Sequence, residues 1–177
     1  MDEPADTNAG LIGPIVVTAK GMANPDGSPK DVDREFFTLF TVFDENASLY
    51  LDENIQTFTG HPATVNPDDE GFIESNLMHS VNGYVYGNLP LESITMHLGK
   101  RVRWYVIAQG TEVDLHTPHW HGNTVLLMGM RTDVVELLPM SMKVADMVPD
   151  DVGTWLYHCH VNDHITAGML VRYRVDP

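Results

Sequence analysis

The C-terminal half of the chain alternates between short apolar runs and turn residues. Glycine or proline separates most of the runs, at Gly87, Pro90, Gly99 and Gly110. The runs predict strands at residues 81–85, 93–97, 101–107, 113–121, 124–128, 134–138 and 142–147, followed by a final pair around Cys159 and Val171. Short strands with turn signals about every 8–12 residues are typical of all-β sandwiches and barrels. We therefore expect an all-β fold, a Greek-key β-sandwich or barrel.

The N-terminal half is less regular. A nearly continuous apolar run at residues 34–44 predicts a central strand, and residues 10–18 predict a short strand with β-branched residues at its end. Residues 20–32 are rich in Asn, Asp, Gly and Pro and predict turns and a linker. Residues 45–79 predict loops or short helices, with one helical turn at 74–78.

Composition excludes several classes of function. The 177 residues suit one domain, or one domain plus part of another, and 43% hydrophobic residues are enough for a core. A formal charge of −15 argues against a nucleic-acid partner and favours cations. No apolar run approaches the roughly 20 residues of a membrane span, so none is expected. The acidic start, Met1-Asp2-Glu3-Pro4, does not resemble a secretion signal, and a single cysteine excludes an internal disulfide.

The segment 155–169 contains the densest chemistry of the chain. It holds the only cysteine, Cys159, together with His158, His160, His164 and Met169. A thiolate, an imidazole and a thioether, with one further histidine, are the ligands of a blue copper site. In a strand, successive side chains point to opposite faces, so Cys159 should face one way while His158 and His160, about 6.5–7 Å apart, face the other.

A second histidine-rich segment, residues 115–122, supplies the missing ligand. By the same alternation His119 and His121 share a face and His116 lies on the other, although Pro118 can distort such a strand. If the two segments pair side by side, His116 meets Cys159. The other two histidines then meet His158 and His160, which makes one mononuclear ligand set and one set of four histidines.

A similarity between two segments of the chain suggests how the chain is divided into domains. Residues 8–17 are similar to residues 166–173, with Leu11 at the place of Met169. We therefore expect residues 1–20 to be the closing strand of a preceding domain, 21–32 a linker, and 33–177 the copper-binding domain. Because Met1 stands directly before this tail, we expect a chain shortened from a longer one, or a split gene.

Several motifs resemble the multicopper oxidases, and within them the ceruloplasmin–hephaestin branch. The resemblance covers nearly the whole chain and is strongest at residues 10–14, 42–46, 74–76, 78–83, 114–116 and 158–164. It implies a cupredoxin fold, an extracytoplasmic location and copper as the cofactor.

The resemblance also implies a role for each candidate residue. His116, Cys159, His164 and Met169 would be ligands of a type 1 copper, His119 a ligand of a type 2 copper, and His121, His158 and His160 ligands of a type 3 pair. Electrons from a reductant would pass from Cys159 through His158 and His160 to a cluster that reduces O₂ to water. Glu92, His97 and Asp163 would bind iron(II) beside the type 1 copper; a phenol or an amine is the alternative reductant.

The family's trinuclear cluster takes eight histidines, four from each of two domains, and this chain offers four. An upstream cupredoxin domain or a neighbouring subunit should supply the others, and a homo-oligomer of two copies is a second route. Without such a partner the chain is expected to be inactive as an oxidase.

Two other classes of copper protein, and one of structural protein, remain as alternatives. A stand-alone blue copper electron carrier has no use for His119, His121 and His160. A copper nitrite reductase needs a histidine on only one side of the cysteine. A metal-free scaffold has no need of the intact ligand set.

Overall fold

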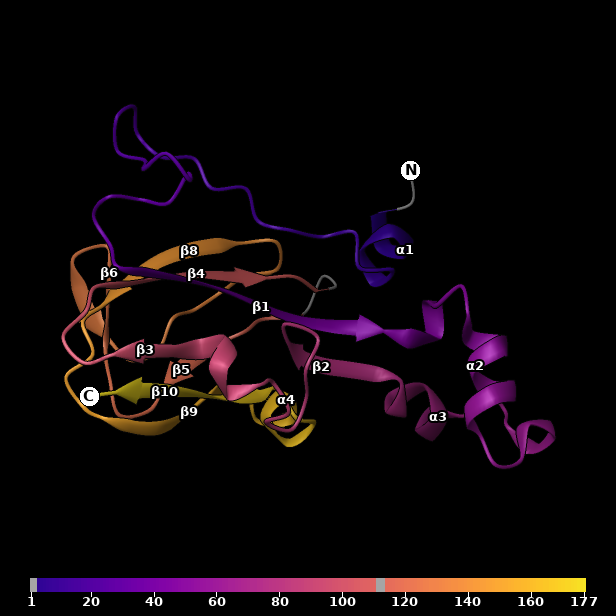
Figure 1. Ribbon diagram of the computed structural model, residues 1–177. Coiled ribbons are helices and arrows are strands. Elements are labelled where there is room, and N and C mark those ends of the chain that lie inside the picture. Colours follow the sequence, from indigo (N-terminus) through magenta and orange to yellow (C-terminus); the bar gives the residue numbers. More distant parts are fainter. Residues whose placement is uncertain (1–2, 111–113) are drawn as a thin grey trace.

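The computed structural model describes residues 3–110 and 114–177, and within them two β-sheets pack face to face (Figure 1). The strands are β1 (Arg34–Asp44), β2 (Leu77–Val81), β3 (Thr95–His97), β4 (Val102–Ala108), β5 (Pro118–Trp120), β6 (Val125–Leu127), β7 (Met130–Thr132), β8 (Met142–Met147), β9 (Gly153–Cys159) and β10 (Leu170–Asp176). The helices are α1 (Glu3–Asn8), α2 (Leu51–Phe58), α3 (Glu70–Ser75) and α4 (Asn162–Thr166), with 3-10 turns η1 (Glu45–Ala47), η2 (Pro62–Thr64) and η3 (Leu91–Ile94). The expected all-β sandwich is confirmed.

The larger sheet is built around β1. Its strand order is β2-β1-β4-β8-β6-β7, and β1 pairs parallel with β4 and antiparallel with β2. The expected strands at 34–44 and 142–147 form with these bounds as β1 and β8. β1 is an interior strand, second from the edge, and apolar side chains on both its faces suit a strand with neighbours on either side.

The smaller sheet carries the two histidine-rich segments. Its order is β3-β10-β9-β5, so β9 lies between β10 and the edge strand β5. The register pairs Pro118 with Cys159 and His119 with His158. Pro118 is the first residue of the edge strand, where a missing N–H is tolerated.

Aromatic side chains fill the space between the sheets. Trp104, Trp120, Tyr157 and Tyr173 are all at most 1% exposed. The Trp104 ring centroid lies 5.5 Å from that of Trp120, 5.2 Å from that of Tyr157 and 5.9 Å from that of Tyr173. Trp104 therefore joins both sheets at the centre of the core.

The central place of Trp104 predicts a large loss of stability on truncation. Trp104→Ala should lower the free energy of unfolding of the metal-free chain by about 3–5 kcal/mol, because a buried indole leaves a cavity that the core cannot fill. Urea unfolding measures it. As the control, Leu49→Ala, at a side chain 82% exposed, should change the same quantity by less than about 0.5 kcal/mol. A loss below about 1 kcal/mol for Trp104→Ala would contradict this packing.

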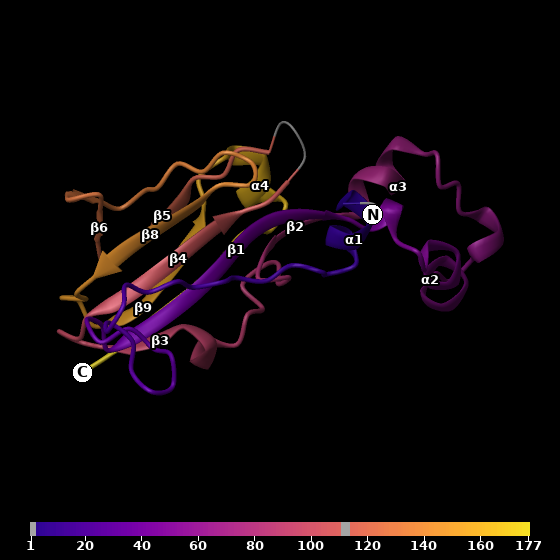
Figure 2. The same ribbon diagram turned by 90° about the horizontal axis from the view of Figure 1, so that it is seen from above.

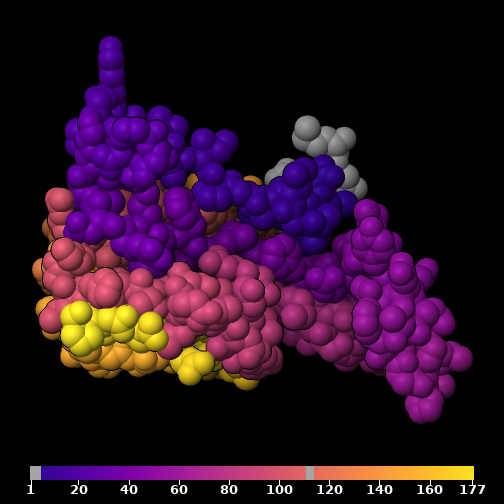
Figure 3. Space-filling model, in the orientation of Figure 1, coloured from indigo at the N-terminus to yellow at the C-terminus, as the bar shows by residue number. Residues whose placement is uncertain are grey.

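Residues 45–76 form a helical extension between β1 and β2. It contains α2 and α3 and projects from one end of the sandwich (Figures 1 and 3). The Asp69 carboxylate caps α3 by accepting the Phe72 N–H at 3.0 Å. The helical turn expected at 74–78 is thus displaced, because α3 ends at Ser75 and β2 already begins at Leu77.

Several expected strands are absent or shifted. The strand expected at residues 10–18 does not form; the segment crosses the outer face of the larger sheet (Figures 1 and 2) without a partner strand. The strand expected at 81–85 ends at Val81, because Asn82 and Gly83 both have positive φ and make a two-residue hairpin turn that returns to Tyr84. At 93–97 only Thr95–His97 is strand.

The expected strand at 134–138 is present only as isolated bridges to the first histidine segment. His116 and Leu137 exchange both backbone hydrogen bonds, at 3.0 and 2.9 Å, and the Val135 N–H donates to the Pro118 carbonyl at 3.0 Å. Pro118 has no N–H to return, so the ladder is interrupted there. The segment nevertheless supports the backbone around His116.

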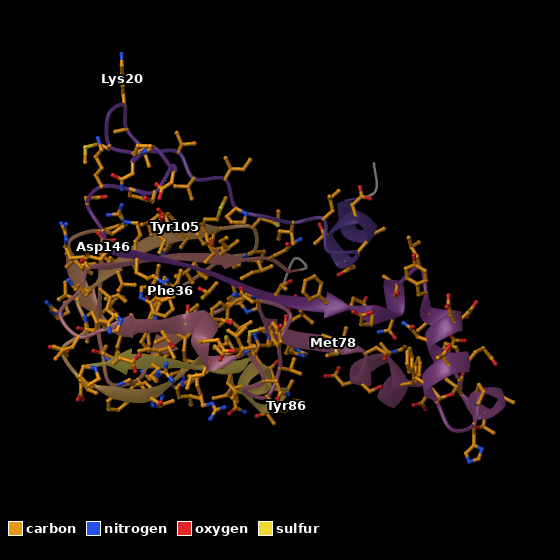
Figure 4. All side chains as sticks on the ribbon, viewed as in Figure 1. Lys20, Phe36, Met78, Tyr86, Tyr105 and Asp146 are labelled. Atoms are coloured by element: carbon orange, nitrogen blue, oxygen red, sulfur yellow. The ribbon has the colours of Figure 1, made fainter. Side chains whose placement is uncertain are left out.

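The Arg103 side chain connects residues 20–32 with the larger sheet. The Arg103 guanidinium on β4 donates to both Asp31 and Asp146, at 2.9 and 2.7 Å for the shortest bond to each. Figure 4 shows Asp146 and Tyr105 on this face, below the loop that ends in Lys20. Within the described residues no helix is long and apolar enough to cross a membrane.

Candidate metal centre

Two groups of side chains in the described part of the chain have converging ligand atoms. In the first, here called the cysteine group, the ligand atoms of His116, Cys159 and His164 lie within 4.8 Å of one another and all three residues are buried. In the second, the ligand atoms of His119, His121 and His158 do the same, and His160 lies beside them. These four histidines are called the histidine group.

The alternation of β9 separates the two groups. Cys159 and Tyr157 point into the sandwich and are fully buried, whereas His158 between them points toward His119, its partner on β5. The His119 Nδ1 lies 3.3 Å from the His158 Nε2 across the two strands. The structure therefore separates His116, Cys159 and His164 from the four other histidines, as the alternation along the strand predicts.

The cysteine group is arranged to leave ligand atoms free. The Cys159 Sγ lies 3.6 Å from the His164 Nδ1 and accepts the Thr117 N–H at 3.3 Å. The His116 Nε2 lies 3.2 Å from the Gln109 carbonyl, which fixes the proton on Nε2 and leaves a lone pair on Nδ1. That Nδ1 is buried and has no hydrogen-bond partner among the described residues. An unpaired buried nitrogen beside a thiol and a second imidazole fits a soft metal ion.

Burial sets the protonation of this group. It lowers the pKa of His116 to about 4, helped by the neighbouring His164, and it lowers the pKa of His164 as well. Both rings are therefore neutral at pH 7, the form that binds metals. Burial also raises the pKa of the Cys159 thiol, so that binding of a cation would release its proton.

Met169 returns to the cysteine group after a single helical turn. α4 begins at Asn162 and ends at Thr166, and Gly168, at φ +105°, reverses the chain. The Cys159 N–H then donates to the Met169 carbonyl at 3.0 Å, and the Met169 N–H donates to the His164 carbonyl at 2.9 Å. The Met169 side chain is fully buried. Its backbone is thus hydrogen-bonded to the backbones of Cys159 and His164.

His158 is the centre of the histidine group. Its Nδ1 lies 2.8 Å from the Cys159 carbonyl, a position from which an N–H donates, so the lone pair is on Nε2. The His121 Nε2 lies 3.1 Å from that atom. The His160 ring centroid is 5.3 Å from that of His158 and 5.1 Å from that of His119. Burial lowers the pKa of His158 and of His119, so these imidazoles are also neutral at pH 7.

Comparison with known proteins identifies the family. A family model described as multicopper oxidase matches residues 60–177, and human hephaestin is 46% identical over 99% of this chain. The chain belongs to the multicopper oxidases. Mouse ceruloplasmin is 46% identical over 100% of this multicopper oxidase chain, and human ferroxidase HEPHL1 is 44% identical over 99% of it.

The chain spans only a small part of these relatives: about 15% of the length of human hephaestin and 17% of mouse ceruloplasmin. Among solved structures, a multicopper oxidase matches 85% of this chain and 46% of its own with a TM-score of 0.59 and 17% identity. The metallo-oxidase of Campylobacter jejuni matches 85% of this chain and 31% of its own with a TM-score of 0.56 and 16% identity. These likenesses establish the cupredoxin-like fold of this multicopper oxidase domain, and its cofactor is copper.

The three residues expected to bind iron are dispersed on the surface of the multicopper oxidase domain. Glu92 in η3, His97 in β3 and Asp163 in α4 are exposed, and their ligand atoms do not converge within 4.8 Å. His97 pairs with Asp176, whereas Leu170, six residues earlier in β10, pairs with His158. At about 3.3 Å per residue, His97 is therefore about 20 Å along β10 from the level of His158.

Two structural features beside the cysteine group and the histidine group were not predicted from the sequence. The His79 ring packs against the His164 ring with centroids 5.1 Å apart, and His79 is only 7% exposed. Behind the histidine group, Asn123 and Tyr173 form a buried hydrogen-bonded pair at 3.1 Å. Tyr173 is 50 residues from Asn123, so only the strand order brings them together.

Proposed function

We propose that the cysteine group, completed by Met169, is a type 1 copper site and that the histidine group is one half of a trinuclear cluster. In the second group His119 would serve a type 2 copper, and His121, His158 and His160 a type 3 pair. The observation that carries the proposal is the position of Cys159. It belongs to one ligand group, while its two neighbours in sequence, His158 and His160, belong to the other.

In this proposal the chain links two redox sites by its own backbone. Copper ions, when bound, supply the one-electron transfers that take electrons from a reductant and reduce dioxygen to water. Cys159 supplies the thiolate, His116 and His164 supply neutral nitrogens, and the core around them excludes water. The peptide bonds from Cys159 to His158 and His160 give a short covalent route between the sites.

The other four histidines of the cluster would come from a partner. The chain corresponds to about 15% of human hephaestin, which leaves room for further domains in a full-length protein. We expect residues 1–20 to close a preceding cupredoxin domain, 21–32 to be the linker and 33–177 the copper domain. A neighbouring subunit, or a second copy of this chain facing the first, would also supply the missing four histidines. As the family resemblance implies, we place the protein outside the cytoplasm.

Iron(II) is the reductant that we favour, because one relative of similar identity is named a ferroxidase. Glu92, His97 and Asp163 would then receive the ion, with Asp163 the carboxylate adjacent in sequence to His164. Their separation requires either movement or two successive iron positions. A phenol or an amine that approaches the type 1 site directly is the second candidate.

The choice of reductant predicts a selective effect of one carboxylate. In the full-length protein, Asp163→Ala should lower the rate of iron(II) oxidation at least about tenfold and change phenol oxidation by less than about twofold, since only a cation needs the charge. Steady-state rates with both reductants measure it. Asp68→Ala, an exposed acid on the helical extension, is the control and should change neither rate. Equal losses with both reductants would remove the case for iron.

Replacement of Met169 predicts a shift in potential without loss of colour. Met169→Leu keeps the volume of a fully buried side chain but removes a weak thioether donor to copper(II). The reduced state is then relatively favoured, so the potential of the type 1 copper should rise. A redox titration followed by the blue absorption measures it. Met130→Leu, at a side chain 71% exposed, should leave the potential unchanged; a lower potential for Met169→Leu would exclude Met169 as an axial ligand.

A further inference from the structure

The backbone of His121 is held on both sides by residues outside the two ligand groups. β5 ends at Trp120, so His121 lies beyond the regular strand pairing. Its N–H donates to the Leu156 carbonyl on β9 at 3.0 Å, and its carbonyl accepts the hydroxyl of Tyr173 on β10. The backbone N–H and the backbone carbonyl of His121 are therefore both hydrogen-bonded to residues of the smaller sheet.

The Tyr173 hydroxyl is buried in the apolar core, where a polar group costs free energy unless it forms hydrogen bonds. Tyr173 is fully buried, and its oxygen also accepts from the Asn123 Nδ2 at 3.1 Å. Asn123 is 4% exposed, and its Oδ1 accepts the backbone N–H groups of Asp150 and Asp151 at 3.0 and 3.2 Å. A phenylalanine would fill the space of Tyr173 without the cost of burying a hydroxyl. The hydroxyl therefore contributes through its hydrogen bonds, and one of its partners is the His121 carbonyl.

The residue after His121 is fixed from the other side. Gly122 has φ +73°, and a Cβ there would lie 2.3 Å from the Trp155 ring carbon Cδ2. The Trp155 Nε1 donates to the Asp151 carbonyl at 3.2 Å. The indole thus covers the peptide between His121 and Asn123 and prevents it from turning outward.

The His121 ring packs against two other members of the histidine group, with its centroid 4.7 Å from that of His119 and 5.2 Å from that of His158. The residue is exposed, yet its Nε2 lies 3.1 Å from the His158 Nε2. Which rotamers bring this imidazole to its neighbours depends on where the backbone places the Cα and Cβ atoms of His121. The orientation of the ring toward His158 consequently depends on the peptide that Tyr173 and Asn123 hold.

We propose that Tyr173, supported by Asn123, is a positioning residue that sets the His121 imidazole against His158 and so prepares the histidine group for metal. The inference rests on the proposed function only for the identity of that metal. Its geometric part, the placement of one ring against another, concerns the metal-free chain.

The test compares Tyr173→Phe with Thr38→Val. Thr38 makes the matching buried hydrogen bond to the other core tyrosine hydroxyl, at 3.0 Å from Tyr157, and does not touch His121. Nitrogen-15 NMR of the metal-free chain measures the nitrogen–nitrogen coupling across the hydrogen bond between the His121 Nε2 and the His158 Nε2. We expect the coupling in the wild type and in Thr38→Val, and its loss in Tyr173→Phe, with similar thermal midpoints in the two variants.

Zinc(II) alone provides the second readout, added to protein whose cysteine group already holds copper. Loss of a residue that orients a ligand typically costs 10–100-fold in metal affinity, so Tyr173→Phe should bind zinc at the histidine group about 10–100-fold more weakly, with the blue band unchanged. Wild-type coupling and zinc affinity retained in Tyr173→Phe, or equal losses in Thr38→Val, would overturn the inference. So would a wild type without the coupling. A wild type that shows the coupling but binds no zinc would count against the proposed cluster, and the NMR comparison would still decide the role of Tyr173.

Discussion

Cys159→Ser is expected to abolish the blue colour of the copper-loaded protein completely. The colour of a type 1 site comes from charge transfer between a thiolate and copper(II), and Cys159 is the only cysteine of the chain. Serine keeps the size of the side chain and can still accept the Thr117 N–H that now donates to the Cys159 Sγ at 3.3 Å. Its hydroxyl does not ionise near neutral pH, however, so no comparable ligand remains. Visible absorption of wild type and variant at equal copper content measures the effect.

The colour loss must be separated from loss of fold. The thermal midpoint and circular dichroism of the metal-free Cys159→Ser variant should stay close to those of the wild type, because the hydrogen bond from the Cys159 N–H at the end of β9 to the Met169 carbonyl uses only backbone atoms. A folded variant that remains blue would show that the thiolate belongs to no copper site. A colourless wild type with one bound copper would lead to the same conclusion.

The division of ligands could be predicted from sequence because it depends on a local rule. Adjacent residues of a strand point to opposite faces, so the His158-Cys159 pair alone separates the two groups. The long apolar run of β1 was equally clear. Both signals are contained in a few consecutive residues, and the structure confirms the strands and the convergence of the ligand atoms.

Other features depended on which segments meet. Residues 11–19 have the β-branched composition of a strand but no partner strand, so propensity alone was misleading there. The Asn82-Gly83 turn was a readable hairpin signal that was missed, and it displaced the expected strand toward the N-terminus. The link from Tyr173 to His121 joins residues 52 apart in sequence, which no local pattern reports.

The relative positions of Glu92, His97 and Asp163 also could not be predicted from the sequence. The resemblance implies one iron site, whereas the register of β3 and β10 pairs His97 with Asp176, the last residue of β10. Sequence spacing does not give distance when the residues lie on different elements. The iron site therefore remains a proposal, and its test is the selectivity of Asp163→Ala.

The second large effect concerns the isolated chain. His116, Cys159, His164 and Met169 all belong to one domain, so the type 1 copper should be held firmly without a partner. In the proposed trinuclear cluster the histidine group would offer four of the eight ligands, and His160 and His121 are exposed. Incomplete ligation leaves the remaining coppers weakly bound or absent, and without them oxygen cannot be reduced.

Copper stoichiometry of the 177-residue chain, measured with EPR and oxygen consumption at a concentration where the chain is monomeric, tests the central claim most directly. After removal of loosely bound metal we expect about one copper per monomer, a type 1 EPR signal and no appreciable oxygen reduction. Oxygen reduction should appear only when a partner supplies the other four histidines. A monomer that firmly binds four coppers and turns over dioxygen would contradict the account, as would a monomer whose single firmly bound copper gives no type 1 signal.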